Sequence, residues 1–245
     1  SDVDAPQIIG GVRISGYPVE LYVDGDMVYV LMNDWQGYYG SRHAPEVTQR
    51  QGGVVVAVDI SDRAAPQIVD QAFVPGNIQT SRLSRGGGAT ALYVVASGWN
   101  VFETSTGGPG EPVSTSSSSS GAVTVVKSFD VSDGQLVAQS ELDLGGYVSD
   151  IQATPEALLV ARNSWYGNEW EEEGYSSRVS LVDISDPNGI MVEGDQALVL
   201  GQVETQFNMD IQGNVLRVVS GSRWGSNRTN YIQTFDVTDI NAITE

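Results

Sequence analysis

The sequence contains no cysteine, a single histidine, His43, and a single lysine, Lys127. Without cysteine the chain can form no disulfide, no thiolate metal site and no cysteine nucleophile. A lone histidine also excludes zinc and iron sites that depend on several His or Cys ligands. No stretch approaches the ~20 consecutive apolar residues that a membrane-spanning helix requires. We therefore expect neither a metal centre of these kinds nor insertion into a membrane.

Positive charge is also scarce. The 245 residues include 12 Lys and Arg against 31 Asp and Glu, which gives a formal net charge of −19. Nucleic acid and anionic lipid are repelled by such a surface, so we expect neither as a partner. The sequence leaves open whether this acidity reflects a salty habitat or a functional surface. Residues 1–4 are acidic where a signal peptide would be basic, so a signal for export would lie outside this sequence.

The chain does contain a short acidic phrase in four copies, each after an alternating apolar run and before a turn. The interval from the first copy to the second is 71 residues, and each later interval is 53 residues. Repeats of this size without a helical pattern inside them predict the blades of a β-propeller. The copies are Asp59-Ile60-Ser61-Asp62, Asp130-Val131-Ser132-Asp133, Asp183-Ile184-Ser185-Asp186 and Asp236-Val237-Thr238-Asp239.

These phrases divide the chain into four repeat units. Each unit supplies an outer strand after the phrase, a strand after a glycine turn, a strongly apolar strand, and the strand that leads into the next phrase. We predict an all-β fold of four-stranded antiparallel blades in a single propeller domain, or in a segment of one. The unit boundaries lie near 1–60, 61–131, 132–184 and 185–237, and a further unit starts at 238–245.

Two arrangements of the blades remain open. The stretch Ala5-Pro6-Gln7-Ile8 recurs 60 residues later as Ala65-Pro66-Gln67-Ile68, which indicates that the chain begins in mid-repeat. An outer strand over residues 7–14 could complete the last blade and close a four-bladed ring. Alternatively the chain is a segment of a larger ring, with further blades from the same protein or from another copy. We favour the segment, because both ends fall inside a repeat.

The first phrase lies in a longer pattern, Val-Val-Ala-Val-Asp-Ile-Ser-Asp-x3-Pro-Gln-Ile-Val over residues 55–69, with a glycine turn soon after it. This pattern resembles the secreted bacterial and archaeal β-propeller domains that are distantly related to WD-repeats. Through the four phrases the resemblance covers essentially the whole chain. It implies an extracellular or cell-envelope location and a binding or scaffolding role. It transfers no catalytic residue, because that family shares an architecture and export and has no common catalytic set.

The paired aspartates of the phrase are candidates for binding Ca²⁺, which prefers oxygen ligands. Their recurrence in every unit favours a structural interpretation, in which each carboxylate accepts backbone N–H groups in a turn. Ca²⁺ at one or two of the turns is the alternative, and no other cofactor is expected. The candidate ligands are Asp59, Asp62, Asp183 and Asp186.

Three polar residues align near the glycine turns of their units: Glu20, Asp150 and Asn208. In a propeller the strand after this turn lines the axial channel. These side chains could form a polar ring around water or a cation, or they could be polar groups that a wet channel tolerates. Carboxylates such as Glu20 and Asp150 could also do acid–base work if one of them were desolvated.

Each apolar run is followed by a small polar residue and a tryptophan, and tyrosines crowd the same loops. We expect these loops and the glycine turns to emerge on one face of the ring. Exposed aromatic side chains there would suit recognition of a protein or a carbohydrate. A tryptophan repeated in every blade could instead pack between blades as core. The candidate binding residues are Trp35, Tyr38, Tyr39, Trp99, Trp165, Tyr166, Trp170 and Trp224.

Together these features predict a non-enzymatic module, secreted or in the cell envelope, that presents an aromatic and acidic loop face to a protein or glycan partner. One alternative is a glycan hydrolase or lyase that uses paired loop or channel carboxylates. Another is a purely structural repeat of a larger envelope protein. A Ser-His-Asp triad around His43 is not expected, because no Gly-x-Ser-x-Gly elbow accompanies it.

Overall fold

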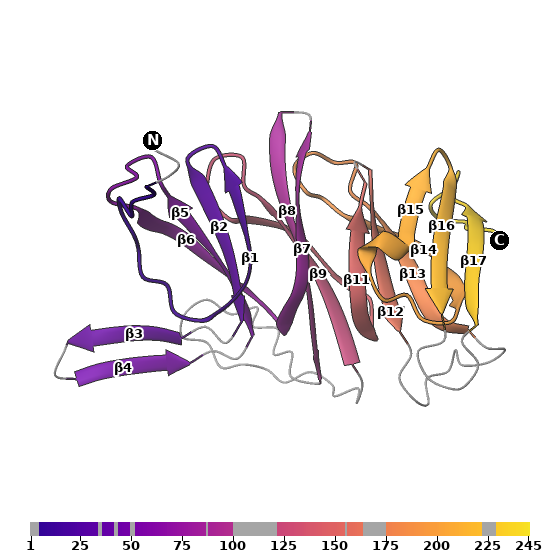
Figure 1. Ribbon diagram of the computed structural model, residues 1–245, viewed down its shortest axis with the longest axis horizontal. Coiled ribbons are helices and arrows are strands. Elements are labelled where there is room, and N and C mark those ends of the chain that lie inside the picture. The colour runs from indigo at the N-terminus through magenta and orange to yellow at the C-terminus, as the bar shows by residue number, and fades with distance from the viewer. Residues whose placement is uncertain are drawn as a thin grey trace.

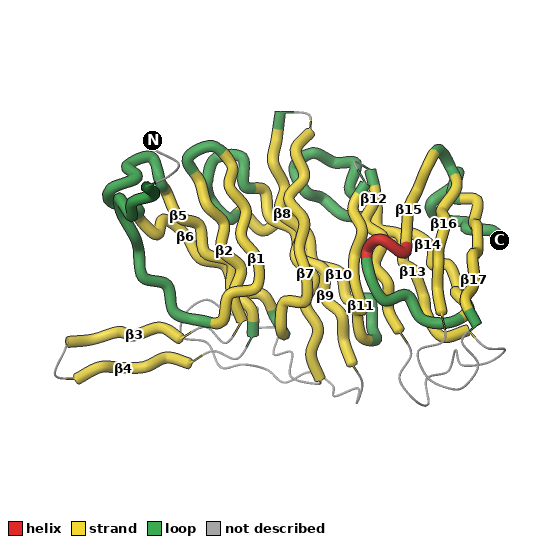
Figure 2. The backbone as a smooth tube through the Cα atoms, in the orientation of Figure 1, coloured by secondary structure: helices red, strands yellow, loops and turns green. Residues whose placement is uncertain are grey.

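The computed structural model of the chain describes residues 5–33, 36–41, 44–49, 52–86, 88–99, 122–154, 156–163, 175–221 and 229–245, with backbone alone for 36–41, 44–49, 99, 122, 147, 175 and 176. Strands dominate these residues, and the only helical element among them is the short 3-10 turn η2 (Gln206–Asn208) (Figure 2). Over the same residues, no helix has the length and apolar character needed to cross a membrane. The all-β prediction is therefore confirmed.

Four antiparallel sheets stand side by side in a row, in chain order (Figure 1). Each of the first three sheets has four strands, and three strands are paired in the fourth. The first sheet contains β1 (Tyr17–Asp24), β2 (Met27–Asn33), β5 (Gly53–Asp59) and β6 (Gln67–Val74). The second contains β7 (Asn77–Gly86), β8 (Ala89–Trp99), β9 (Ala122–Asp130) and β10 (Val137–Asp143). The third contains β11 (Tyr147–Ala153), β12 (Ala157–Asn163), β13 (Tyr175–Asp183) and β14 (Val192–Leu200), and the fourth contains β15 (Met209–Gln212), β16 (Val215–Gly221) and β17 (Asn230–Asp236).

The hydrophobic core lies between the sheets, because each inner sheet buries both of its faces. Strand β12 is buried along its whole length. Its side chains alternate between two clusters: Leu158 packs toward the second sheet, and Leu159 packs toward the fourth. Fully burying one such side chain is worth roughly 1.5–3 kcal/mol. The continuous apolar runs in the sequence are therefore strands enclosed by neighbouring sheets, as in the blades of a propeller.

The first strands of the first three sheets share an irregularity of register close to their start. The pairing with the following strand shifts between Pro18 and Glu20 in β1, between Ile78 and Thr80 in β7, and between Val148 and Asp150 in β11. A β-bulge of this kind redirects the side chain that follows it. In β1 and β11 the redirected residues are Glu20 and Asp150, which the sequence predicted to line an axial channel.

The register also defines two edges of the row. Met27 pairs with Asp59 at one end of the first sheet, and Tyr17 pairs with Asn33 at the other end. The third sheet repeats this arrangement, with Ala157 opposite Asp183. We call the end where the acidic phrases lie the Asp edge, and the end where β2, β8, β12 and β16 finish the Trp edge.

The four sheets do not close into a ring, and the two ends of the chain lie at opposite ends of the row (Figure 1). Residues 7–14 form no strand, so the less favoured alternative, in which this stretch completes the fourth blade and closes a ring, is wrong. The segment lies against the first sheet instead: a Cβ at Gly10 would stand 2.2 Å from the carbonyl oxygen of Arg63, a closeness that only glycine permits. On the outer side of β17, one antiparallel bridge joins its last residue, Asp236, to Thr244.

Candidate functional site

The four acidic phrases build the same turn. In each, Oδ1 of the first aspartate accepts the backbone N–H of the residue two positions on, at 2.7 Å for Asp59 and Ser61 and 2.8 Å for Asp183 and Ser185. The second aspartate does the same in three of the phrases, for example Asp62 with the N–H of Ala64 at 3.0 Å. These are Asx-type turns, in which a carboxylate satisfies backbone donors that no strand can reach.

Hydrogen bonding in the turns also stabilises the charged carboxylates. The pKa of Asp59 is lowered, first by the backbone N–H of Ser61 and then by its hydroxyl. The pKa of Asp236 is lowered by the hydroxyl and the N–H of Thr238. Within the described residues, no three His, Cys, Asp or Glu side chains gather so that they could hold a metal ion. Calcium at Asp59, Asp62, Asp183 or Asp186 stays a prediction.

The first strands of the sheets carry a network of polar side chains, which we call the axial network (Glu20, Tyr22, Ser81, Arg82, Asp150 and Gln206). Its first part joins the first two sheets. The hydroxyl of Tyr22 donates to the carbonyl oxygen of Ser81 at 2.8 Å, and the buried hydroxyl of Ser81 donates to the carboxylate of Glu20. Burial is the main cause of a raised pKa for Tyr22. Glu20 is therefore engaged by the neighbouring sheet.

Arg82 joins the second sheet to the third and to η2. Its guanidinium donates to the carbonyl oxygen of Ser81 at 2.6 Å, to that of Ile151 at 3.0 Å, and to the side chain of Gln206. Asp150 completes the connection, because its Oδ2 accepts the N–H of Gln206 at 2.9 Å and its Oδ1 accepts the N–H of Ile151 at 2.8 Å. One arginine therefore crosses the axial side of three successive sheets.

The structure brings together only part of the predicted channel set. Glu20 and Asp150 belong to the axial network, whereas Asn208 caps η2 by accepting the N–H and the hydroxyl of Thr205, each at 3.0 Å. Sequence reasoning missed Arg82. The available signal was its position on the strand that follows a glycine turn, in a chain with only 12 basic residues.

Most of the predicted aromatic binding residues lie outside the described residues, namely Trp35, Trp165, Tyr166, Trp170 and Trp224, as does His43. Trp99 is the last residue of β8, where its backbone pairs with Ala122 at the Trp edge. Tyr38 and Tyr39 lie on β3 (Gln36–Ser41), which pairs with β4 (Ala44–Gln49). This hairpin extends away from the row near the end of β2 (Figure 1).

Two of the small polar residues that precede a tryptophan, Asn33 and Asn163, join successive sheets at the Trp edge. The amide of Asn33 donates to the carbonyl oxygen of Ile78 at 3.0 Å and accepts the N–H of Ile78 at 2.7 Å, which fastens the first sheet to the second. The amide of Asn163 donates to the carbonyl oxygen of Val203 at 3.1 Å, between the third sheet and the segment that leads into the fourth. These side chains hold the glycine turns of successive sheets in place.

The sequence as a whole, residues 1–245, matches the family model described as a Beta propeller domain. The chain belongs to this family. Its four sheets are therefore propeller blades, and the axial network lines the side of the propeller on which the first strand of each blade lies. No curated protein matches the propeller domain. What the family establishes is the fold and, more coarsely, the use of such domains for binding or scaffolding.

Proposed function

We propose that this propeller domain is a non-enzymatic binding or scaffolding module, secreted or in the cell envelope, and that its Trp edge contacts a protein or glycan partner. The observation that carries the proposal is the backbone register. It sets the ends of β2, β8, β12 and β16 at one edge of the row, beside the starts of the first strands. The segments that follow β2, β12 and β16 each contain a tryptophan, and β8 ends in Trp99.

The rigidity of the blades supports this proposal. Strand β12, which leads to the Trp edge, is buried along its whole length, and side-chain amides such as that of Asn33 join one blade to the next at that edge. A rigid scaffold that carries variable segments is the usual arrangement of a binding surface. Aromatic side chains add large contact area at low entropic cost.

The test is a glycan array and a panel of purified cell-envelope proteins, both probed with the labelled domain. We expect a saturable partner whose binding is weakened by Trp99→Ala and by Trp35→Ala. Phe207→Ala is the matched control, since Phe207 is an aromatic residue, 87% exposed, that lies on η2 and not at the Trp edge. Equal binding by the tryptophan variants and the native domain would contradict the proposal.

Among the described residues, no observation favours the hydrolase or lyase alternative. Glu20 and Asp150 are each bonded to groups of a neighbouring blade or of η2, and their hydrogen bonds serve packing. That alternative and the purely structural one stay sequence predictions.

A further inference from the structure

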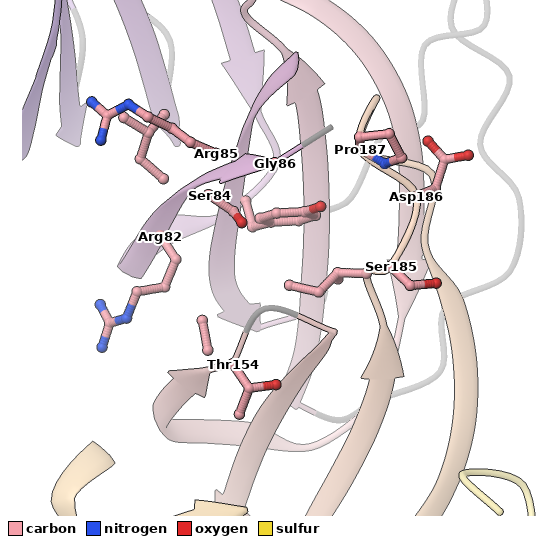
Figure 3. Close-up of a pocket in the computed structure, with 12 residues that line it drawn as sticks. Arg82, Ser84, Arg85, Gly86, Thr154, Ser185, Asp186 and Pro187 are labelled. Carbon is pink, nitrogen blue, oxygen red and sulfur yellow. The ribbon is translucent and has the colours of Figure 1, made fainter. Parts of the chain in front are cut away.

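A cavity of about 570 Å³ lies between the second and third blades, toward the Asp edge (Figure 3). One wall is the second half of β7, from Arg82 to Gly86. The opposite wall consists of Ala153 and Thr154, where β11 ends, and of the turn at residues 184–187. Its volume falls within the roughly 300–1,000 Å³ that is typical of small-molecule sites, and it is partly open to solvent. It is separate from the Trp edge.

The hydroxyl of a largely buried tyrosine, Tyr93, opens onto this cavity. Tyr29 and Tyr93 lie on the second strands of neighbouring blades, and each is only 1% exposed. The hydroxyl of Tyr29 donates to the carbonyl oxygen of Val131 at 2.9 Å, in the acidic phrase of the next blade. Tyr93 lines the cavity, and its hydroxyl makes no hydrogen bond to any residue that the structure describes. The ring of Tyr93 is buried, whereas its hydroxyl oxygen is accessible from the cavity, so this hydroxyl is available to a ligand.

The charges beside the cavity are already compensated or are directed elsewhere. Arg85 forms an ion pair with Asp24 at 3.0 Å, and Arg82 belongs to the axial network. Both guanidinium groups point away from Thr154, Ser185 and Asp186 (Figure 3). Asp186 already uses Oδ1 to accept the N–H of Asn188 at 2.8 Å. The cavity therefore offers no pair of free arginines for an anion.

The remaining polar groups that line the cavity are hydroxyls and one carboxylate. Ser84 lies on β7, while Thr154 and Ser185 lie on the opposite wall, beside Asp186. Burial raises the pKa of Tyr93 to about 12, with further contributions from the charges of Asp186 and Asp183, so its hydroxyl is a neutral donor and acceptor at physiological pH. Hydroxyl groups on both sides and a carboxylate acceptor match a ligand that itself carries many hydroxyl groups.

We propose that this cavity is a binding site for a small neutral sugar, which would satisfy the hydroxyl of Tyr93 and contact Ser84, Ser185 and Asp186. The site lies at the opposite edge of the blades from the partner surface proposed above. It is also independent of that surface, so that either proposal can fail alone.

The experiment is an NMR titration of the isotopically labelled domain with D-glucose, D-galactose, N-acetyl-D-glucosamine and trehalose, each added to tens of millimolar. We expect at least one sugar to cause saturable shifts at the amides of residues 82–86, 154 and 184–186. Tyr93→Phe removes the hydroxyl and keeps the ring, and it should weaken that binding about tenfold, the effect of one lost hydrogen bond. Ser84→Val should also weaken it.

Tyr29→Phe is the matched control, because it removes the equivalent hydroxyl from a blade interface that has no part in the site. It should leave the affinity unchanged. The absence of saturable shifts with every sugar would overturn the proposal, and so would equal binding by Tyr93→Phe and the native domain. Shifts confined to the Trp edge would also overturn it, while leaving the proposed partner surface intact. Saturable binding of ethylammonium chloride at these amides without any sugar binding would assign the cavity to cations and overturn it as well.

Discussion

At the scale of single residues, buried polar groups of this domain are used to join one blade to the next. The hydroxyl of Tyr29 reaches the acidic phrase of the second blade, and the hydroxyl of Ser128 donates to the carbonyl oxygen of Gly189 at 2.5 Å in the third. Such bonds add modest stability when made, but a buried group left without a partner costs about 1–3 kcal/mol. A different pairing of blades would leave these buried polar groups without partners, so they favour the observed arrangement of neighbouring blades.

Ionisation of the buried tyrosines should destabilise the domain at alkaline pH. Burial raises the pKa values of Tyr29 and Tyr93 to about 12, from 10.0. The folded state then holds these protons more tightly than the unfolded state, so the contribution is complete below pH 10 and is lost as the pH rises through 12. Each tyrosine contributes on the order of 2 kcal/mol to this loss.

Arg162 acts in the opposite direction. Burial lowers its pKa to about 10, so the folded state binds this proton less tightly than the unfolded state. Its contribution to the free energy of unfolding therefore increases as the pH rises above 10. Two tyrosines should outweigh one arginine. Urea unfolding at a series of pH values measures the balance. The double variant with Tyr29→Phe and Tyr93→Phe should lose less stability between pH 10 and 12 than the native domain. An equal loss in both proteins would refute this assignment.

At the scale of the elements, the same kind of hydrogen bond recurs on the outer strands of the blades, where a polar side chain accepts a backbone N–H of a connecting segment. On the outer strands, the carboxylate of Asp70 accepts the N–H of Leu136 at 2.8 Å, and that of Asp195 accepts the N–H of Ile243 at 3.0 Å. In the second blade the hydroxyl of Ser140 accepts the N–H of Met191 at 3.1 Å. An outer strand with a short polar side chain thus receives the connecting segment of the following blade, which keeps that segment in register.

Among the contacts at the Trp edge, the hydrogen bonds between the Asn33 amide and Ile78 should contribute most to stability. Asn33→Leu leaves the N–H and the carbonyl of Ile78 without partners, and Ile78 is only 3% exposed. We expect the free energy of unfolding to fall by about 1–3 kcal/mol. The matched control is Asn77→Leu, at an exposed neighbouring position, which should change it by less than about 0.5 kcal/mol. Chemical denaturation measures both, and similar values for the two variants would contradict the role of Asn33.

At the scale of the whole molecule, the blades are held together by three apolar interfaces and by the axial network. The interfaces give most of the stability, since burial of apolar surface is the dominant favourable term in folding. The axial network orients the blades relative to one another, because Arg82 of the second blade reaches past the third blade to Gln206. An open row of blades has no ring closure to fix its curvature, so contacts between non-adjacent blades matter more here.

Replacing Arg82 should therefore weaken the whole row. Arg82→Met removes four hydrogen bonds to groups of its own blade, the third blade and η2, and should lower the free energy of unfolding by about 2–3 kcal/mol. Arg85→Met is the matched control. Arg85 lies on the same strand, but its ion pair with Asp24 is largely exposed and should be worth less than about 1 kcal/mol. A larger loss for Arg85→Met than for Arg82→Met, in thermal or urea unfolding, would rule out the axial role.

The amino-acid sequence by itself determined the strands of the four blades, their order along the chain and the Asx-type turns. Alternating and continuous apolar runs are local signals, and the Asx-type turns at Asp59 and Asp183 depend on neighbours only two residues away. The partners of residues far apart in the chain were decided by the tertiary structure alone. Arg82 meets Gln206, and Tyr93 lies beside Asp186, only after three blades have packed.

The open row was decided in the same way. Residues 7–14 have the pattern of an outer strand, but a strand requires a neighbouring strand to pair with, and in the folded molecule Gly10 lies against the backbone of Arg63 in the first blade. The physical reason is that the hydrogen-bonding groups of a strand are satisfied by another segment of chain. Local sequence can specify an extended conformation, whereas only the packed molecule determines which segment becomes its partner.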